Sequence, residues 1–247
     1  MTPSHGGVGP FPAREQDGGT VIGFQRWDRL LFLHFEVPHQ SLRALVPSRL
    51  ELDTFEGRAF VSVTPFTVVG ARLRGAPALP GISQFHELNV RTYVRCGEDR
   101  AVWFFSLDAA SPAAVAIARA SLRLPYCYAG MHRSEDRGVF RYDSVRILPA
   151  PQATFSGSWS VQGDAAPAEP GTLSHFLCER YALFSRAFAS KLFRVRVRHA
   201  PWPLRAAEDV RFAETLAQAD GLPPLGAPVL AQYSDGVDVE FFPPALV

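Results

Sequence analysis

Apolar and polar residues alternate along many short segments of the chain, as they do in strands that bury one face. The alternation is clearest at residues 85–95, and a Cys96-Gly97-Glu98-Asp99 turn joins this segment to a hairpin partner. The pattern predicts strands at residues 31–37, 59–67, 85–95, 101–107, 139–146, 154–161 and 192–198, and two short strands on either side of a turn at 234–236.

Other segments have the spacing of helices. Ser111 is a good N-cap and Pro112 suits the first helical position, so an Ala-rich helix is predicted up to Leu122. A short helix is predicted at 40–46, a longer one at 172–184, and a weaker one at 208–220. Glycine and proline predict loops at 70–81 and 164–171, the first long enough to border a pocket.

These elements amount to roughly eight to ten strands and three or four helices, without regular βαβ alternation. They predict an α+β fold with a large, curved, mainly antiparallel sheet that forms a barrel-like or sandwich body. With 247 residues, the chain suits a single domain over residues 21–247. Residues 1–20 are rich in glycine and proline and are predicted to form a disordered tail.

Charge and composition narrow the possible partners. The net charge of +1 gives no long-range attraction for nucleic acid or an anionic membrane. No apolar run is long enough to span a bilayer, and residues 1–20 do not resemble a signal peptide. The three cysteines follow no metal or redox motif and are expected to be reduced. We therefore expect a cytoplasmic protein, with no nucleic-acid or membrane partner and with a homo-oligomer left open.

The chain lacks the usual motifs for metals and cofactors. Its seven histidines show no zinc-binding spacing, and neither a phosphate-binding loop nor a Gly-x-Ser-x-Gly elbow is present. We expect no metal and no cofactor. Of the 25 basic residues, only Lys191 is a lysine, so lysine chemistry is excluded from nearly every position.

The strand at 85–95 has an unusual polar row on one face. Glu87, Asn89 and Arg91 share that face, with Phe85 and Tyr93 at its ends. Alternate residues lie roughly 7 Å apart along a strand, so the row is about 14 Å long. It could face solvent and form a cross-strand salt bridge, or it could line a pocket, where flanking aromatic rings are common.

Particular residues suggest chemistry if the row lines a pocket. Arg91 could hold a carboxylate through two hydrogen bonds, and Glu87 could transfer protons if burial raises its pKa. Tyr126 and Tyr128 are candidate hydrogen-bond donors at the pocket wall, although core packing would also explain them. Cys127 between them fits a buried, unreactive thiol better than a nucleophile.

Several blocks of sequence together resemble a known family. The most specific are Glu87-Leu88-Asn89-Val90-Arg91-Thr92-Tyr93 and Trp103-Phe104-Phe105-Ser106-Leu107-Asp108, supported by Leu124-Pro125-Tyr126 and Glu179-Arg180-Tyr181. On these residues the chain resembles the YqjF-like family, which has no established activity, over roughly residues 24–242. That family is similar to the acetoacetate decarboxylase superfamily.

This resemblance implies a curved sheet that closes around a central pocket, with Glu87 matching a strand glutamate that points inward. Acetoacetate decarboxylases also carry a Pro-Lys-Lys run whose first lysine forms a Schiff base with substrate. The corresponding residues here are Pro125-Tyr126-Cys127, so Schiff-base decarboxylation is not expected.

The sequence thus predicts a pocket for a small organic ligand, for instance a carboxylate. The predicted lining is Glu87, Asn89, Arg91, Tyr93, Phe105, Tyr126 and Tyr128. Two functions stay open: lysine-free acid–base catalysis with Glu87 as the proton-transferring group, or a non-catalytic ligand-sensing or dimerising module with a vestigial pocket.

Overall fold

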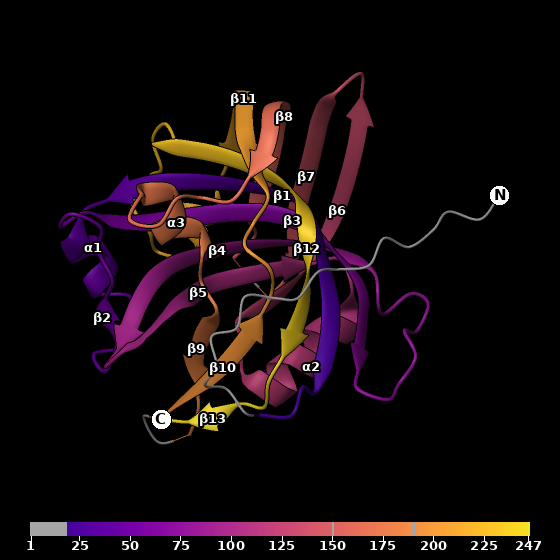
Figure 1. Cartoon of the computed structure of the whole chain (residues 1–247), viewed down its shortest axis with the longest axis vertical. Coiled ribbons are helices and arrows are strands. Elements are labelled where there is room, and N and C mark those ends of the chain that lie inside the picture. Colours follow the sequence, from indigo (N-terminus) through magenta and orange to yellow (C-terminus); the bar gives the residue numbers. More distant parts are fainter. Residues whose placement is uncertain (1–18, 150, 189–190) are drawn as a thin grey trace.

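One large sheet dominates the computed structural model, which describes residues 19–149, 151–188 and 191–247 (Figure 1). Its strands within these residues are β1 (Gly23–Val37), β2 (Glu51–Leu52), β3 (Ala59–Leu73), β4 (Phe85–Cys96), β5 (Asp99–Ala109), β6 (Tyr126–Asp136), β7 (Val139–Leu148), β8 (Thr154–Ala166), β9 (Ala182–Arg186), β10 (Leu192–Arg198), β11 (Leu204–Glu214), β12 (Leu230–Phe241) and β13 (Ala245–Leu246). The helices are α1 (His39–Arg43), α2 (Pro112–Leu122), α3 (Leu173–Cys178) and α4 (Leu216–Ala219). The predicted tail at 1–20 lies, apart from its last two residues, outside the described residues.

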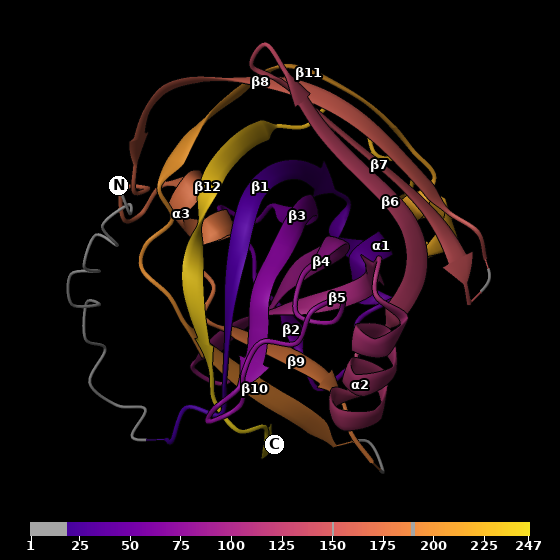
Figure 2. The same cartoon turned by 90° about the vertical axis from the view of Figure 1, so that its right-hand side faces the viewer.

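The sheet closes on itself twice. Strands β12, β1, β3, β4, β5, β9 and β10 form one circuit, the seven-strand ring. Strands β5, β6, β7, β8, β11, β12, β1, β3 and β4 form a second circuit, the nine-strand ring. In Figure 2, β6, β7, β8 and β11 arch over the strands that the two rings share. Only β5–β6 and β5–β9 pair in parallel among the described strands, which confirms the predicted curved, mainly antiparallel α+β body.

Alternation along the shared strands divides side chains between the two rings. Leu88 and Val90 of β4 belong to a core cluster with Phe155 and Trp159, which fill the nine-strand ring. The intervening residues of β4 therefore point into the seven-strand ring. The polar row of β4 thus has a defined place, inside the smaller ring.

Helix α2 forms as its sequence predicts. The Ser111 side chain accepts a hydrogen bond from the Ala114 backbone amide, and the helix ends at Arg123, which has a left-handed backbone. Helix α1 likewise falls where a short helix is predicted.

Two predicted helices are wrong in part, because strand pairing outweighs local helix spacing. The helix predicted at 172–184 ends at Cys178, and the following segment becomes β9, which pairs with both β5 and β10. Most of the helix predicted at 208–220 is instead β11, paired along its length with β8, and only the four residues of α4 are helical.

The turn predicted at 234–236 is also wrong, since β12 runs unbroken through it. Gly236 makes this possible, with a φ of 115° and the Trp27 carbonyl packed where a side chain would begin. Strands β2, β6, β9 and β13 were not predicted. No helix in residues 19–149, 151–188 and 191–247 is long and apolar enough to cross a membrane.

Candidate functional site

A cavity of about 580 Å³ lies inside the seven-strand ring, with α2 as its outer wall. Helix α2 buries none of its residues completely, although several of them line the cavity. The rim carries exposed apolar side chains: Ile22, Leu73, Ile82 and Ile117. Deeper in, aromatic rings form much of the wall: Trp27, Phe66, Phe85, Phe104 and Trp202. A walled, largely apolar cavity with few polar groups is typical of a small-molecule site.

The polar row of β4 lines this cavity. Glu87, Asn89 and Arg91 are 4%, 5% and 9% exposed, which rules out the solvent-facing alternative. Strand β4 lies in the middle of the sheet between β3 and β5, so its backbone is held by neighbours on both sides. The three side chains are consequently presented to the cavity from a rigid strand.

Glu87 is held by a tyrosine from another strand. The Tyr126 hydroxyl donates a hydrogen bond to Glu87 Oε2 at 2.9 Å. Burial raises the pKa of Glu87 to about 8, since the Tyr126 hydrogen bond, which lowers it, only partly offsets desolvation. The nearby Asp108 carboxylate raises it further. Glu87 is therefore mostly a neutral, proton-bearing acid at pH 7.

Arg91 has buried nitrogens that no atom of the described residues satisfies. Its Nε and Nη2 lack a hydrogen-bond partner, and its guanidinium lies 5.6 Å from the centre of the Phe32 ring. The side-chain oxygen of Asn89 is likewise buried and without a partner. Thr64, across on β3, also leaves its hydroxyl unpartnered at the cavity wall. Buried polar atoms are usually satisfied, so these three groups are available to a ligand or to water.

Arg180 is a second cavity cation, which sequence reasoning missed. Its Nη1 pairs with Asp53 at 2.6 Å and its Nε donates to the Phe176 carbonyl at 2.7 Å. The guanidinium lies 4.2 Å from the centre of the Phe176 ring, while Nη2 has no partner in the part of the chain that the structure describes. Arg180 lies within one of the sequence blocks that carry the family resemblance, but no local pattern predicts that it lines the same cavity as Arg91.

Cys178 lines the cavity beside a buried hydrogen-bond network. Its thiol lies 3.7 Å from His34 Nε2, and His34 Nδ1 lies 2.6 Å from the Ser62 hydroxyl. Burial lowers the pKa of His34 to about 3 and raises that of Cys178 to about 12. Both groups are neutral near pH 7, so this pair has no thiolate to act as a nucleophile.

Three of the predicted lining residues are not on the cavity wall. Tyr93 shares the face of the polar row, but its ring packs on Phe176 and its hydroxyl bonds Ser62, which closes the end of the ring. Phe105 occupies a β-bulge in β5, which turns it toward the core of the nine-strand ring and brings Phe104 to the cavity instead. Tyr128 lies two residues beyond Tyr126 and outside the lining.

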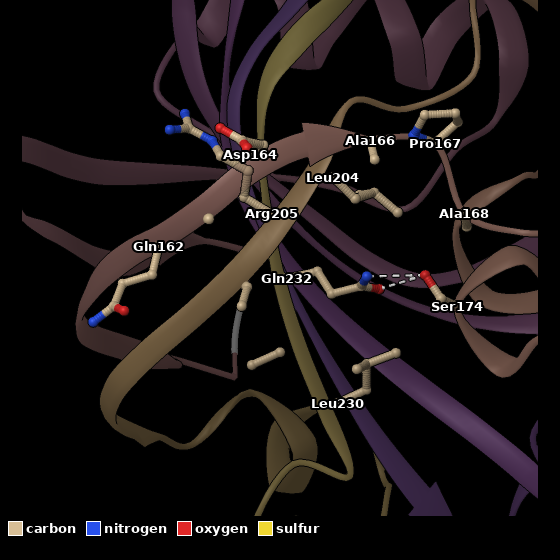
Figure 3. A pocket seen from close by; sticks show the side chains of 13 residues that line it. Gln162, Asp164, Ala166, Pro167, Ala168, Ser174, Leu204, Arg205, Leu230 and Gln232 are labelled. Atoms are coloured by element: carbon tan, nitrogen blue, oxygen red, sulfur yellow. Dashed lines mark hydrogen bonds between the residues drawn. The ribbon is translucent and has the colours of Figure 1, made fainter.

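A separate groove of about 340 Å³ lies between β8, β11, β12 and the segment before α3 (Figure 3). In this groove the Gln232 side chain exchanges hydrogen bonds with Ser174. Gln232 Oε1 also accepts a hydrogen bond from Cys178, which lines the cavity. Helix α3 is thus the layer that separates the groove from the cavity. Arg205 lines the groove and pairs with Asp235, away from the cavity.

The residues of the site show no metal cluster and no lysine. No group of three or more His, Cys, Asp or Glu in the described part of the chain could hold a metal ion. Lys191 is exposed, directly before β10, and does not line the cavity. The cavity chemistry therefore rests on Glu87, Tyr126 and the two buried arginines, and a third arginine, Arg72, is exposed at the rim.

Solved structures with the same fold include acetoacetate decarboxylase-like proteins. An acetoacetate decarboxylase from Legionella pneumophila superposes with a TM-score of 0.65 at 10% identity, covering 96% of this chain and 91% of that chain. An acetoacetate decarboxylase-like enzyme from Sphingomonas wittichii RW1 gives 0.64 at 14%, covering 96% and 100%. The enduracididine biosynthesis enzyme MppR gives 0.64 at 13%, covering 92% and 88%. At these identities the likeness establishes the fold.

Sequence comparison identifies nearer relatives. The uncharacterised protein YqjF of Bacillus subtilis (strain 168) is 37% identical over 225 residues, which cover 91% of this chain and 92% of YqjF. The model of the DUF2071 family, described as uncharacterised conserved proteins, matches residues 24–238. Since this match spans most of the chain and YqjF aligns over nearly its full length, the chain belongs to the DUF2071 family.

Proposed function

We propose that the cavity binds a small organic carboxylate whose negative charge pairs with Arg91. The observation that carries this proposal is the buried guanidinium of Arg91, which lines the cavity with two unsatisfied nitrogens. No described acidic side chain forms an ion pair with it. An isolated buried charge is costly, whereas a planar guanidinium binds a carboxylate through two parallel hydrogen bonds. A bound carboxylate would remove that cost.

Glu87 supplies the acid–base chemistry of the proposed site. Below about pH 8 it carries a proton that it can donate to a ligand oxygen, and above that pH it can accept one. The sequence resemblance puts Tyr126 where decarboxylases have a Schiff-base lysine, and the Tyr126 hydroxyl orients Glu87. Any catalysis in the cavity is accordingly lysine-free. MppR, which shares the fold, has been solved in complex with pyruvate, so a small carboxylate suits that protein's version of this fold.

The second candidate function is binding without turnover, as in a ligand sensor. It is favoured by the neutral states of His34 and Cys178, which leave no activated nucleophile among the described cavity residues. Both functions require the carboxylate to bind at Arg91, and they differ only in whether Glu87 transfers a proton during a reaction.

Titration calorimetry with short and medium-chain carboxylates tests the proposal, with the matching primary amides as uncharged controls. Arg91→Met keeps the length of the side chain and removes its charge. We expect it to weaken carboxylate binding by about 10- to 100-fold, the usual effect of losing hydrogen bonds to a charged group. The matched control is Arg205→Gln, which removes a charge from the groove and should leave the affinity unchanged. Equal affinity for acids and amides, or no loss in Arg91→Met, would contradict the proposal.

Glu87→Gln separates catalysis from binding once a ligand is known. Gln has nearly the same shape and can still accept the Tyr126 hydrogen bond, but it cannot transfer a proton at neutral pH. If the protein is an enzyme of the proposed kind, this variant binds ligand and loses turnover. A ligand that is never converted by the wild type would identify the non-catalytic alternative.

A further inference from the structure

The buried ionisable side chains of the cavity gather at two ends. Arg91 and Arg180 mark one end: the Arg180 guanidinium lies 5.1 Å from the centre of the Tyr93 ring, and Tyr93 follows Arg91 by two residues on the same face of β4. Glu87 and Tyr126 mark the other end. Arg91 follows Glu87 by four residues on β4, a separation of about 13 Å between their Cα atoms.

The charges at the cation end sum to one unpaired positive charge. Arg180 is balanced by Asp53, which is 5% exposed and 2.6 Å away. Arg91 has no acidic partner among the described residues, and Glu87 at the far end is mostly uncharged at pH 7. A ligand with one negative charge neutralises the buried part of the cavity, because the third lining arginine, Arg72, is exposed. A second carboxylate would meet the acid end without a buried cation. This charge balance favours a monocarboxylate.

The wall between the two ends is apolar. Phe66 of β3, Phe104 of β5, Leu183 of β9 and Val197 of β10 line it from different strands of the ring. Asn89 on β4 and Thr64, its register partner on β3, are the polar exceptions. A ligand that reached both ends would therefore place several carbon atoms against this wall, which apolar burial would favour.

We infer that the ligand is an elongated monocarboxylic acid: its carboxylate lies at Arg91 and Arg180, its hydrocarbon middle lies against the apolar wall, and a carbonyl or hydroxyl oxygen accepts a hydrogen bond at Glu87. This inference rests on the proposed function and deepens it. It excludes short 2-oxo acids as the best ligands, because their carbonyl is adjacent to the carboxylate and cannot reach Glu87 while Arg91 holds the acid group.

Four eight-carbon acids test the inference by calorimetry at pH 7: octanoate, 2-oxooctanoate, 7-oxooctanoate and octanedioate. Relative to octanoate, the two oxo acids add a keto group at different positions, and octanedioate adds a second carboxylate. We expect 7-oxooctanoate to bind tightest, by about 5- to 10-fold over octanoate for one added neutral hydrogen bond, and octanedioate to bind most weakly. Glu87→Met, which keeps a similar length without a polar group, should remove the advantage of 7-oxooctanoate, so that it binds no more tightly than octanoate.

The outcomes distinguish this inference from the proposed function. If 2-oxooctanoate binds as tightly as 7-oxooctanoate, or if Glu87→Met affects both equally, the elongated ligand is refuted while binding at Arg91 stands. If none of the acids loses affinity in Arg91→Met, the proposed function itself fails. The double variant Arg180→Gln/Asp53→Asn serves as a second probe of the cation end without leaving a buried carboxylate unpaired. A loss for all four acids is expected because Nη2 of Arg180, which has no partner among the described residues, would contact the same carboxylate.

Discussion

The raised pKa of Glu87 makes the stability of the fold depend on pH. The isosteric substitution Glu87→Gln should remove this dependence. Glu87 is fully buried, and its pKa rises from an ordinary value of 4.5 to about 8. The folded protein therefore keeps a proton that the unfolded chain releases over this interval. The contribution of Glu87 to stability is complete below about pH 4.5 and is lost as the pH rises through about 8.

The size of this effect follows from the difference between the folded and unfolded pKa values of Glu87. The free energy of unfolding falls by at most about 1.4 kcal/mol for each pH unit between the two values, or by about 5 kcal/mol over the whole interval. Asp108, whose pKa burial raises to about 6, and His34, whose pKa burial lowers to about 3, also titrate differently in the two states. The difference between the wild type and Glu87→Gln isolates Glu87, because those other groups are present in both proteins.

Urea denaturation at a series of pH values from 5 to 9 measures this difference. At each pH, the free energy of unfolding of Glu87→Gln is compared with that of the wild type. We expect this difference to shift in favour of the variant by about 3 to 5 kcal/mol from pH 5 to pH 9. The gain should be steepest between pH 5 and 7.5, since the folded group itself ionises near pH 8. A difference that stays within about 1 kcal/mol over the whole range would show that Glu87 titrates normally and would refute the reasoning.

Three further predictions concern the supports of the cavity. Arg180→Met leaves Asp53 buried without its close partner and should lower the free energy of unfolding by about 3 to 5 kcal/mol in urea. Gly236→Ala puts a Cβ 2.1 Å from the Trp27 carbonyl oxygen, at a φ of 115°, and should lower the thermal midpoint by an amount equivalent to at least about 2 kcal/mol. Alkylation followed by peptide mass spectrometry should find Cys96 modified well before Cys178, because Cys178 is buried and its pKa is raised to about 12.

Each of these three predictions has its own control. The double variant Arg180→Met/Asp53→Asn should recover much of the lost stability, since no carboxylate is then left unpaired. Gly226→Ala should be nearly neutral, because a Cβ there meets open space. If Cys96 and Cys178 are alkylated at similar rates only in denaturant, burial is the cause of the slower reaction of Cys178. Rapid alkylation of Cys178 in the native protein would contradict the described packing.

The polar row was predictable because a strand's period of two is a local property. Glu87, Asn89 and Arg91 had to share a face, but their pattern alone could not say whether that face met solvent or a cavity. That depended on α2 and on strands β9 and β10, which are distant in sequence and close the ring. The family resemblance supplied this information, which the residue pattern lacked.

Other parts of the site depended on pairings that no local pattern encodes. A bulge in β5 places Phe104, rather than Phe105, at the cavity wall. The sequence alternation along the strand does not reveal the one extra residue that makes the bulge. Arg180 enters the cavity because Asp53 and Phe176 position it, which requires three segments to meet. The helix predicted at 208–220 failed similarly, since its residues gain more from the long ladder with β8 than from local spacing.

A crystal structure with octanoate or a better-binding acid of the same series would show where the carboxylate binds. We expect the carboxylate in the cavity, with its oxygens about 2.7 to 3.2 Å from Nε and Nη2 of Arg91. The hydrocarbon chain should run along the apolar wall toward Glu87. A carboxylate at the rim beside Arg72, or an acid found in the groove of Arg205, would contradict this expectation.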